Sequence, residues 1–188
     1  DRTTMTTWLQ QQDALTPIDI LIANAGCSTT QLKEQYNSLH DIESALWAIH
    51  LQGTLNTIHP ILSCMQQRQS GHIVLMSSIN AFVATASSTS YGAAKAALLH
   101  YGRSLRGKLL KDRIAVSVIC PGWVDSQLTK KNTFKMPFKM PAERAAAIMQ
   151  HGIQKKKIVI AFPWPLRLIT RCIALLPERL KAYITQRT

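Results

Sequence analysis

Short apolar runs alternate along this chain with longer segments whose apolar residues recur at helical spacing. Parallel strands need such crossover segments between them, so the alternation is typical of a parallel α/β sheet. No internal repeat or Gly/Ser linker interrupts it, which indicates one domain. The pattern predicts strands over 18–23, 72–78, 114–120 and 157–162, and helices over 3–12, 38–69, 90–111 and 142–154.

Local signals support the helix boundaries. Ser38 is a good N-cap with Asp41 three residues later, and Gly71 follows the end of the same segment. Pro141 is expected at the first position of the helix over 142–154. Trp8 and Trp47 occupy helical positions and are expected in the core.

Composition excludes several classes of protein. The 188 residues are 46% hydrophobic and 17% charged, with 8 Gly and 8 Pro, which excludes disordered and collagen-like chains. No uncharged apolar run reaches the roughly 18 to 20 residues of a membrane-spanning helix, and the first residues do not resemble a signal peptide. The cysteines form no C-x-x-C pair, and Cys64, Cys120 and Cys172 lie in apolar stretches. We therefore expect reduced, buried thiols, no metal site and a cytoplasmic protein.

Charge is concentrated in the last third of the chain. Residues 1–127 carry 9 Lys+Arg and 8 Asp+Glu, whereas residues 128–188 carry 13 and 2. An anionic neighbour (a membrane surface, a nucleic acid or a phosphorylated ligand) and a merely solvated basic face both explain this distribution. No helix-turn-helix, zinc or RNA-binding pattern is present, so we expect no nucleic-acid partner.

Residues 163–188 form an amphipathic basic tail after the domain of residues 1–162. Arginines inside the helical run make spanning of a bilayer unfavourable, and Pro177 ends the run. The pattern is typical of a helix that lies on the inner surface of the membrane, although packing on the sheet or closing a substrate pocket explains it equally. The predicted apolar face comprises Leu166, Ile169, Cys172, Ile173 and Leu176, opposite Arg167, Thr170, Arg171 and Ala174.

Candidate chemistry gathers where the predicted strands end. Tyr91 and Lys95 lie one helical turn apart on one face, and an ammonium there favours the phenolate and lowers the pKa of the tyrosine. Ser78 ends a strand 13 residues before Tyr91. Because the carboxyl ends of parallel strands meet in one crevice, these residues are expected to converge with the turns 24–26 and 121–122.

This constellation resembles the short-chain dehydrogenase/reductase family over about residues 13–162. The resemblance implies a Rossmann-like doubly wound parallel α/β sheet and an oxidoreductase that uses NAD or NADP to interconvert a small-molecule carbonyl and an alcohol. Whether the cofactor is NAD or NADP stays open. The matching motifs are Leu21-Ile22-Ala23-Asn24-Ala25-Gly26, Ser77-Ser78, Tyr91-Gly92-Ala93-Ala94-Lys95 and Pro121-Gly122-Trp123-Val124-Asp125-Ser126.

The resemblance also implies a role for each residue. Tyr91 is the general acid or base, Ser78 orients the carbonyl oxygen, and Lys95 lowers the pKa of Tyr91 and holds the nicotinamide ribose. Asn24, Ala25 and Gly26 pass close to the adenosine ribose, and the Pro121-Gly122 turn leads to Val124 and Ser126 at the carboxamide. His50 stands where the family usually has an Asn that relays protons. A proton relay and a merely packed side chain are equally compatible with this histidine.

The chain departs from the family pattern at its start. No glycines are spaced as in the family's phosphate-binding turn, and the first three strands and two helices are absent. We interpret the chain as a fragment of a longer protein rather than a truncated gene product, because the remaining motifs are undamaged. We expect the fragment alone to be inactive, and the strand over 18–23 to form an unpaired edge.

Two further expectations concern partners. The basic segment 127–139 contains Phe and Met at the family's substrate-loop position, which indicates an apolar substrate with an anionic group. The resemblance implies a homo-oligomer. The alternative hypothesis is a non-catalytic relative that keeps an oligomer interface on the two long helices or a role at the membrane surface.

Overall fold

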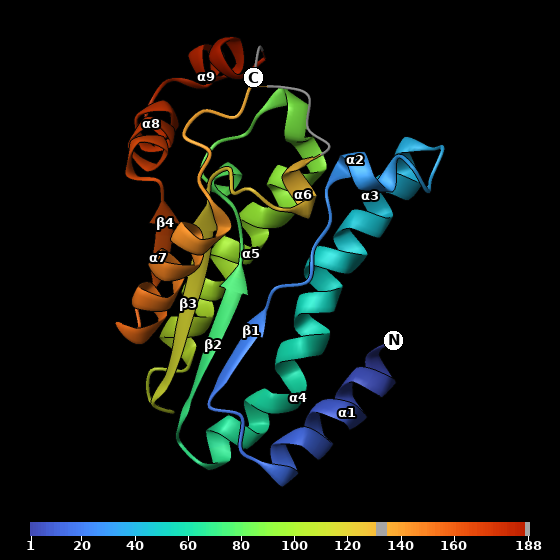
Figure 1. The fold of residues 1–188 in the computed structure, drawn as a ribbon, viewed down its shortest axis with the longest axis vertical. Coiled ribbons are helices and arrows are strands. Elements are labelled where there is room, and N and C mark those ends of the chain that lie inside the picture. The colour runs from blue at the N-terminus through green and yellow to red at the C-terminus, as the bar shows by residue number, and fades with distance from the viewer. Residues whose placement is uncertain (131–134, 187–188) are drawn as a thin grey trace.

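The computed structural model describes residues 1–130 and 135–186 and contains one parallel sheet (Figure 1). Its strands run in the order β1-β2-β3-β4, and every neighbouring pair is parallel, as the alternating pattern predicted. The strands are β1 (Ile20–Ala23), β2 (Gly71–Met76), β3 (Ile114–Pro121) and β4 (Val159–Phe162).

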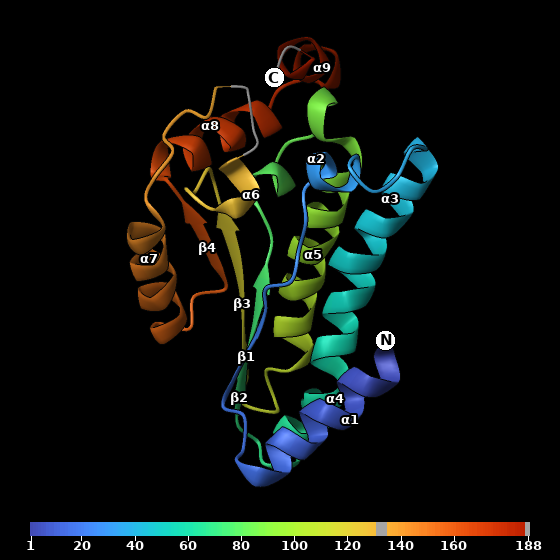
Figure 2. The same ribbon diagram turned by 45° about the vertical axis from the view of Figure 1, so that its right-hand side comes forward.

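Helices cover both faces of this sheet, which confirms the doubly wound α/β class (Figure 2). One face is covered by α4 (Gly53–Gln67) and α5 (Thr89–Lys108), and the other by α7 (Ala142–Gln154). The main core lies between the sheet and the first pair, and a smaller one lies under α7. The remaining helices are α1 (Arg2–Leu15), α2 (Thr29–Leu32), α3 (Leu39–Trp47), α6 (Gln127–Lys130), α8 (Trp164–Ala174) and α9 (Glu178–Thr185).

The predicted helix over 38–69 is divided by a wider turn. It consists of α3, a π-helical turn over Ala48–Gln52, and α4. Ser38 caps its start, since its hydroxyl oxygen accepts a hydrogen bond from the Asp41 N–H at 3.1 Å. Pro141 is the N-cap of α7 rather than its first residue, so that prediction was wrong by one position.

Close contact between α5 and the sheet depends on Gly102. A Cβ at this position would clash with Val118 and Leu75, two fully buried core residues of the sheet. The missing side chain therefore lets the helix lie directly on β2 and β3.

Strand β1 forms one edge of the sheet, as expected. Its side chains alternate, and Ile20 and Ile22 remain 50% and 47% exposed. Three sequence-based expectations about burial were wrong, because helical position alone does not tell which side of a helix is covered. Trp8 and Trp47 are half exposed, and Cys172 is exposed.

The tail forms α8 and α9, which are separated at Pro177 as predicted. The predicted apolar face is divided between protein and solvent, since Leu166, Ile173 and Leu176 are half buried whereas Ile169 and Cys172 are exposed. Leu166 lies against Gly122, while Thr170 and Ile173 border a hollow beside the segment after β2. No described helix is long and apolar enough to cross a membrane. The outward side chains of α8 and the turn after it are Trp164, Leu168, Ile169, Cys172 and Leu175.

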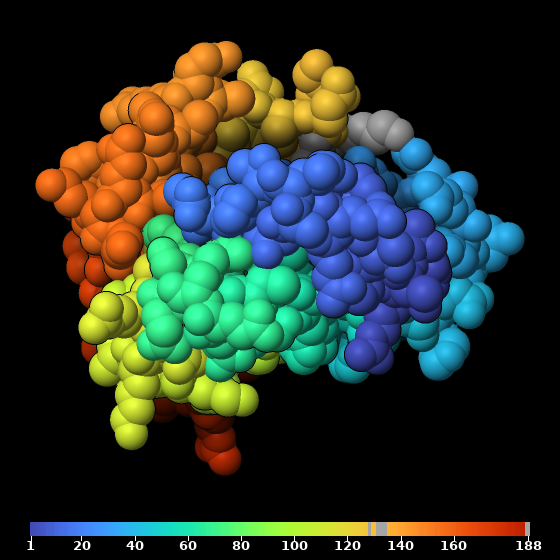
Figure 3. Space-filling model, turned by 90° about the horizontal axis from the view of Figure 1, so that it is seen from below, coloured from blue at the N-terminus to red at the C-terminus, as the bar shows by residue number. Residues whose placement is uncertain are grey.

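An ion pair attaches α1 to the end of α4, at the end of the molecule shown in Figure 3. The buried Asp13 carboxylate accepts hydrogen bonds from the Ile18 N–H at 2.7 Å and from Arg68 Nη1 at 2.9 Å. Arg68 Nη2 also donates to the Ile18 carbonyl oxygen at 2.6 Å. Burial acts to raise the pKa of Asp13, but these hydrogen bonds and the Arg68 charge outweigh it and lower the pKa. The pair therefore holds the entry to β1 in place.

We predict that Asp13→Asn lowers the free energy of unfolding at neutral pH by about 1.5–3 kcal/mol, because hydrogen bonds to a charged acceptor are weakened. A carboxyl with a lowered folded-state pKa stabilises the fold above its unfolded pKa, and this contribution is lost as the pH falls through the folded pKa. The difference from wild type should therefore shrink in acid. Urea denaturation as a function of pH measures it. Asp19→Asn, at an exposed position, is the control, and equal effects of the two variants would contradict the prediction.

Candidate active site

The site is built where three parallel strands end. Met76 ends β2, and Ser77 and Ser78 follow it directly. The turn 24–26 follows β1, and Gly122 follows β3. Because the strands are parallel and adjacent, these segments meet at the carboxyl ends of the strands, where α5 begins (Figure 1). The first turns of α5 carry Tyr91 and Lys95.

Lys95 is the most deeply buried charged group of the site, at 3% exposure. Its Nζ donates a hydrogen bond to the Met76 carbonyl oxygen at 2.7 Å, and its own carbonyl oxygen accepts one from Ser77 Oγ at 2.7 Å. Burial lowers the pKa of the ammonium to about 8, partly opposed by Cys27 and Cys120. Lys95 therefore titrates close to neutral pH, and it is locked to the end of β2.

Tyr91 lies between Lys95, Ser78 and His50. Burial raises the pKa of the phenol, and a hydrogen bond with the Ser78 side chain partly offsets this. The Lys95 ammonium faces the ring of Tyr91, 5.6 Å from its centroid. Burial therefore prevails in this arrangement, and the phenol is neutral at pH 7. The lowering of the Tyr91 pKa by Lys95 stays a prediction.

His50 comes from the π-helical turn and is 1% exposed. Its Nε2 lies 2.9 Å from the Cys27 carbonyl oxygen, and its ring meets that of Tyr91 edge to face with centroids 5.4 Å apart. Burial and the nearby Lys95 charge lower the pKa of His50 to about 4, so the ring is neutral. The Nδ1 atom is buried and has no hydrogen-bond partner among the described residues.

The turn after β1 is shaped by this histidine. A Cβ on Gly26 would lie 2.8 Å from His50 Cε1, so the ring occupies the space that a side chain would need. Cys27 follows, and its half-buried thiol interacts electrostatically with Lys95 and Tyr91. Sequence reasoning missed Cys27 as a site residue, and its place directly after Gly26 was the available signal. Asn24 and Ala25 are exposed beside this turn.

The segment after β3 is ordered by its own hydrogen bonds. The Gly122 N–H donates to the Phe162 carbonyl oxygen at 2.7 Å, and Val124 forms a parallel bridge with Met140. Thr129, which sequence reasoning missed, donates from Oγ1 to the Val124 carbonyl oxygen at 2.6 Å and accepts from the Ser126 N–H at 3.1 Å. Among the described residues, no hydrogen bond joins Ser126 to Tyr91. Pro121 and residues 124–126 therefore lie at the carboxyl ends of the same strands, without a hydrogen bond between Ser126 and Tyr91.

The predicted substrate loop falls partly outside the described residues. Residues 127–130 form α6, whereas 131–134 are not described. Lys139 Nζ forms an ion pair with Asp125 Oδ1 at 3.0 Å, so one basic group of this segment is paired within the protein.

Comparisons with known proteins show the family to which this chain belongs. A family profile described as short chain dehydrogenase matches residues 1–136. An uncharacterized oxidoreductase from Myxococcus xanthus is 34% identical over 168 residues, covering 87% of this chain and 64% of that protein. The chain thus spans less than two thirds of this relative.

Solved structures share the fold. A putative short-chain dehydrogenase from Novosphingobium aromaticivorans superposes with a TM-score of 0.72 at 26% identity, over 95% of this chain and 66% of that one. A short chain dehydrogenase from Burkholderia cenocepacia, solved in complex with NADP, gives 0.76 at 22% identity, over 93% and 71%. The chain belongs to the short-chain dehydrogenase family, as its motifs implied.

We predict that Gly26→Ala destabilises the protein by about 1–3 kcal/mol, because the added Cβ overlaps His50 in a packed region. Gly107→Ala is the matched control, since a Cβ there meets nothing within 4 Å. In a helix it should be neutral or add about 0.5–1 kcal/mol. Thermal unfolding measures both. In the double variant with His50→Ala the cost of Gly26→Ala should largely vanish, and full additivity would contradict the proposed overlap.

Proposed function

We propose that this protein is an NAD(P)-dependent oxidoreductase that interconverts a small-molecule carbonyl and an alcohol. The observation that carries the proposal is the buried cluster of Tyr91, Ser78, Lys95 and His50 at the carboxyl edge of the sheet. A buried ammonium thus lies beside a partly buried phenol. Perturbed groups gathered in this way are typical of catalytic sites.

The residues suit proton transfer in the direction of reduction. The raised pKa keeps the Tyr91 phenol neutral at pH 7, so it carries the proton that a carbonyl oxygen needs on becoming an alcohol. Ser78 holds that oxygen by a hydrogen bond. The Lys95 ammonium, facing the ring, stabilises the phenolate that is left. His50 is neutral, and its buried Nδ1 has no hydrogen-bond partner among the described residues. This atom can accept a proton in turn, which supports the proton-relay hypothesis over simple packing.

The described residues fit the nicotinamide end of the cofactor. Lys95 commits one hydrogen bond to Met76, which leaves ammonium donors for the ribose hydroxyls. Val124 and Ser126 stand at the neighbouring strand end for the carboxamide, and Asn24 to Gly26 are exposed for contact with the adenosine ribose. The cofactor would supply or accept the hydride. Residues 1–188 contain no glycine-rich turn for the diphosphate, so the fit covers the two riboses and the carboxamide but not the diphosphate.

We predict that this 188-residue chain binds NADPH more weakly than about 100 μM, because backbone donors for the diphosphate are not among its residues. Isothermal titration calorimetry measures the affinity. Dissociation constants of a few micromolar for NADH or NADPH would contradict the prediction, and the expectation that this chain alone is inactive would fall with it.

The alternative remains a non-catalytic relative. Such a relative would keep the fold but would not turn over a substrate. We propose a homo-oligomer under both hypotheses. Substitution of the phenol separates the two hypotheses.

We predict that Tyr91→Phe lowers kcat by about 100- to 10,000-fold in a form of the protein that is active with NADPH, because the proton donor is removed. The fold should be unchanged, since only the hydroxyl is lost. Tyr101→Phe, further along the same helix, is the matched control and should retain activity. Near-normal turnover by Tyr91→Phe would show that the catalytic assignment is wrong.

We further propose that the tail contacts an anionic membrane surface. The exposed apolar residues of the tail, here called the outer tail face, are large side chains that are 44–87% exposed. Arg171 and Arg179 are exposed in the same two helices. Residues 163–188 carry five Lys or Arg against one Glu, which complements anionic lipid. Apolar side chains with arginines around them are typical of interfacial helices. The outer tail face comprises Trp164, Leu168, Ile169, Leu175, Leu180 and Tyr183.

We predict that the protein sediments with phosphatidylglycerol-containing vesicles at low salt and less at high salt, because the arginines are screened. Leu168→Glu with Ile169→Glu should abolish sedimentation. Leu110→Glu, at an exposed site outside the tail, should leave it unchanged. Wild-type protein that stays in the supernatant at low salt would refute the membrane proposal.

A further inference from the structure

Strand β4 forms the other edge of the sheet, and one side of its backbone has no partner strand among the described residues. The strand order ends at β4, which pairs only with β3. The carbonyl oxygens of Ile158 and Phe162 accept hydrogen bonds from two N–H groups on the β3 side, at 2.8 and 2.7 Å. Because successive backbone groups of a strand alternate in direction, the N–H and C=O groups of Val159 and Ala161 point away from β3, to the open side.

A groove runs along this open edge, where α7 lies beside β4 (Figure 2). Helix and strand lie close together because Gly152 has no side chain, and a Cβ there would lie 2.6 Å from Ile160 Cδ1. Val159 and Ala161 are half buried and line the groove. The two residues whose backbone groups point outward are therefore accessible from it.

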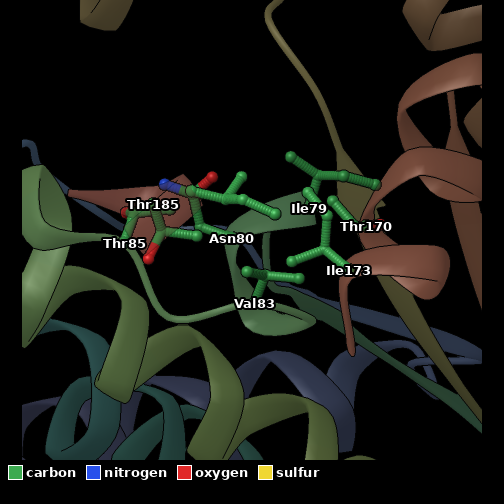
Figure 4. A pocket seen from close by; sticks show the side chains of 8 residues that line it. Ile79, Asn80, Val83, Thr85, Thr170, Ile173 and Thr185 are labelled. Atoms are coloured by element: carbon green, nitrogen blue, oxygen red, sulfur yellow. The ribbon is translucent and has the colours of Figure 1, made fainter. Parts of the chain in front are cut away.

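Basic side chains surround the groove. Arg144 and His151 lie two turns apart on the same side of α7. Lys157 comes just before β4, and Arg167 comes from the beginning of α8. No Asp or Glu lines the groove, and the Lys and Arg side chains form no ion pair among the described residues. The hollow beside the segment after β2 differs, since no charged side chain lines it (Figure 4).

Backbone and charge together favour an extended acidic peptide as the partner. A peptide strand can pair with the outward N–H and C=O groups while its carboxylates meet the cations. A lipid headgroup would use the cations and leave the backbone groups of the strand unpaired. A second copy of this chain fits less well, because pairing of two β4 strands would bring two sets of the same cations together.

We propose that the open edge of β4 binds an extended acidic segment of another protein, which adds to the sheet as a further strand. Its backbone pairs with Val159 and Ala161, and its carboxylates contact Arg144, Lys157 and Arg167. The proposal rests on this edge alone and does not depend on the proposed oxidoreductase activity.

Fluorescence anisotropy with labelled peptides tests the recognition. An eight-residue peptide of alternating Glu and Val should bind the chain at least about ten-fold more tightly than the matching peptide of alternating Lys and Val, whose charge is reversed. A peptide of alternating Glu and Pro keeps the carboxylates but cannot form a strand ladder, and it should bind as weakly as the Lys peptide. No binding of the Glu-Val peptide up to about 1 mM would overturn the proposal. Equal binding of the Glu-Pro peptide would overturn strand addition.

Amide hydrogen exchange locates the bound peptide. At saturation with the Glu-Val peptide, the amides of Val159 and Ala161 should exchange at least about ten-fold more slowly, because they become hydrogen bonded. The Val118 amide already donates to a carbonyl oxygen of the sheet and should change little. Slower exchange at Ile20 and Ile22 of the β1 edge, without an effect at β4, would show that the assigned site is wrong.

Charge reversal tests the role of the cations. Arg144→Glu, at an exposed position on α7, should weaken binding of the Glu-Val peptide by about five-fold or more, because an attraction becomes a repulsion. Lys33→Glu makes the same change of charge at an exposed position outside the groove, and should leave binding within about two-fold of wild type. Equal effects of the two variants would contradict the proposed contact.

The other occupants of the groove give different results. If a second copy occupies the edge, Arg144→Glu should strengthen dimerisation in sedimentation experiments, and the dimer should exclude the peptide. If the groove serves a membrane surface, Arg144→Glu should reduce binding to phosphatidylglycerol vesicles while the Glu-Val peptide binds neither form. Either result would overturn the proposal of an acidic peptide partner.

Discussion

The attachment of helix α5 to the end of strand β2 determines the geometry of the site. A buried ammonium is costly unless its donors are used, and Lys95 meets this demand by donating to the Met76 carbonyl oxygen. The reciprocal bond from Ser77 to the Lys95 carbonyl oxygen closes the contact. Because Tyr91 lies one turn earlier on the same helix, this contact also fixes the distance of the phenol from Ser78. Every proposal about proton transfer depends on it.

The tail presents different side chains to the protein and to solvent. Thr170 and Ile173 border a hollow beside the segment after β2, while Leu168, Ile169 and Leu175 remain exposed.

Sequence reasoning predicted most of the fold and much of the site. The order of strands and helices followed from the alternation of apolar runs and helical segments, and β1 is the edge strand it expected. Errors concerned the burial of single side chains. Trp8, Trp47 and Cys172 were misjudged, because periodicity identifies a stripe and cannot tell which neighbouring element covers it. Cys27 was missed because its role depends on His50, 23 residues away along the chain.

The sequence by itself determined the parallel α/β class, the family motifs and the spacing of Ser78, Tyr91 and Lys95, because these follow from local periodicity and short-range pattern. Only the tertiary structure decided the protonation preferences, since the raised pKa of Tyr91 and the lowered pKa values of Lys95 and His50 arise mainly from burial. It also decided that Gly26 must be small and that α8 packs beside the segment after β2. Burial and packing depend on contacts between segments far apart in the chain, and no local pattern contains them.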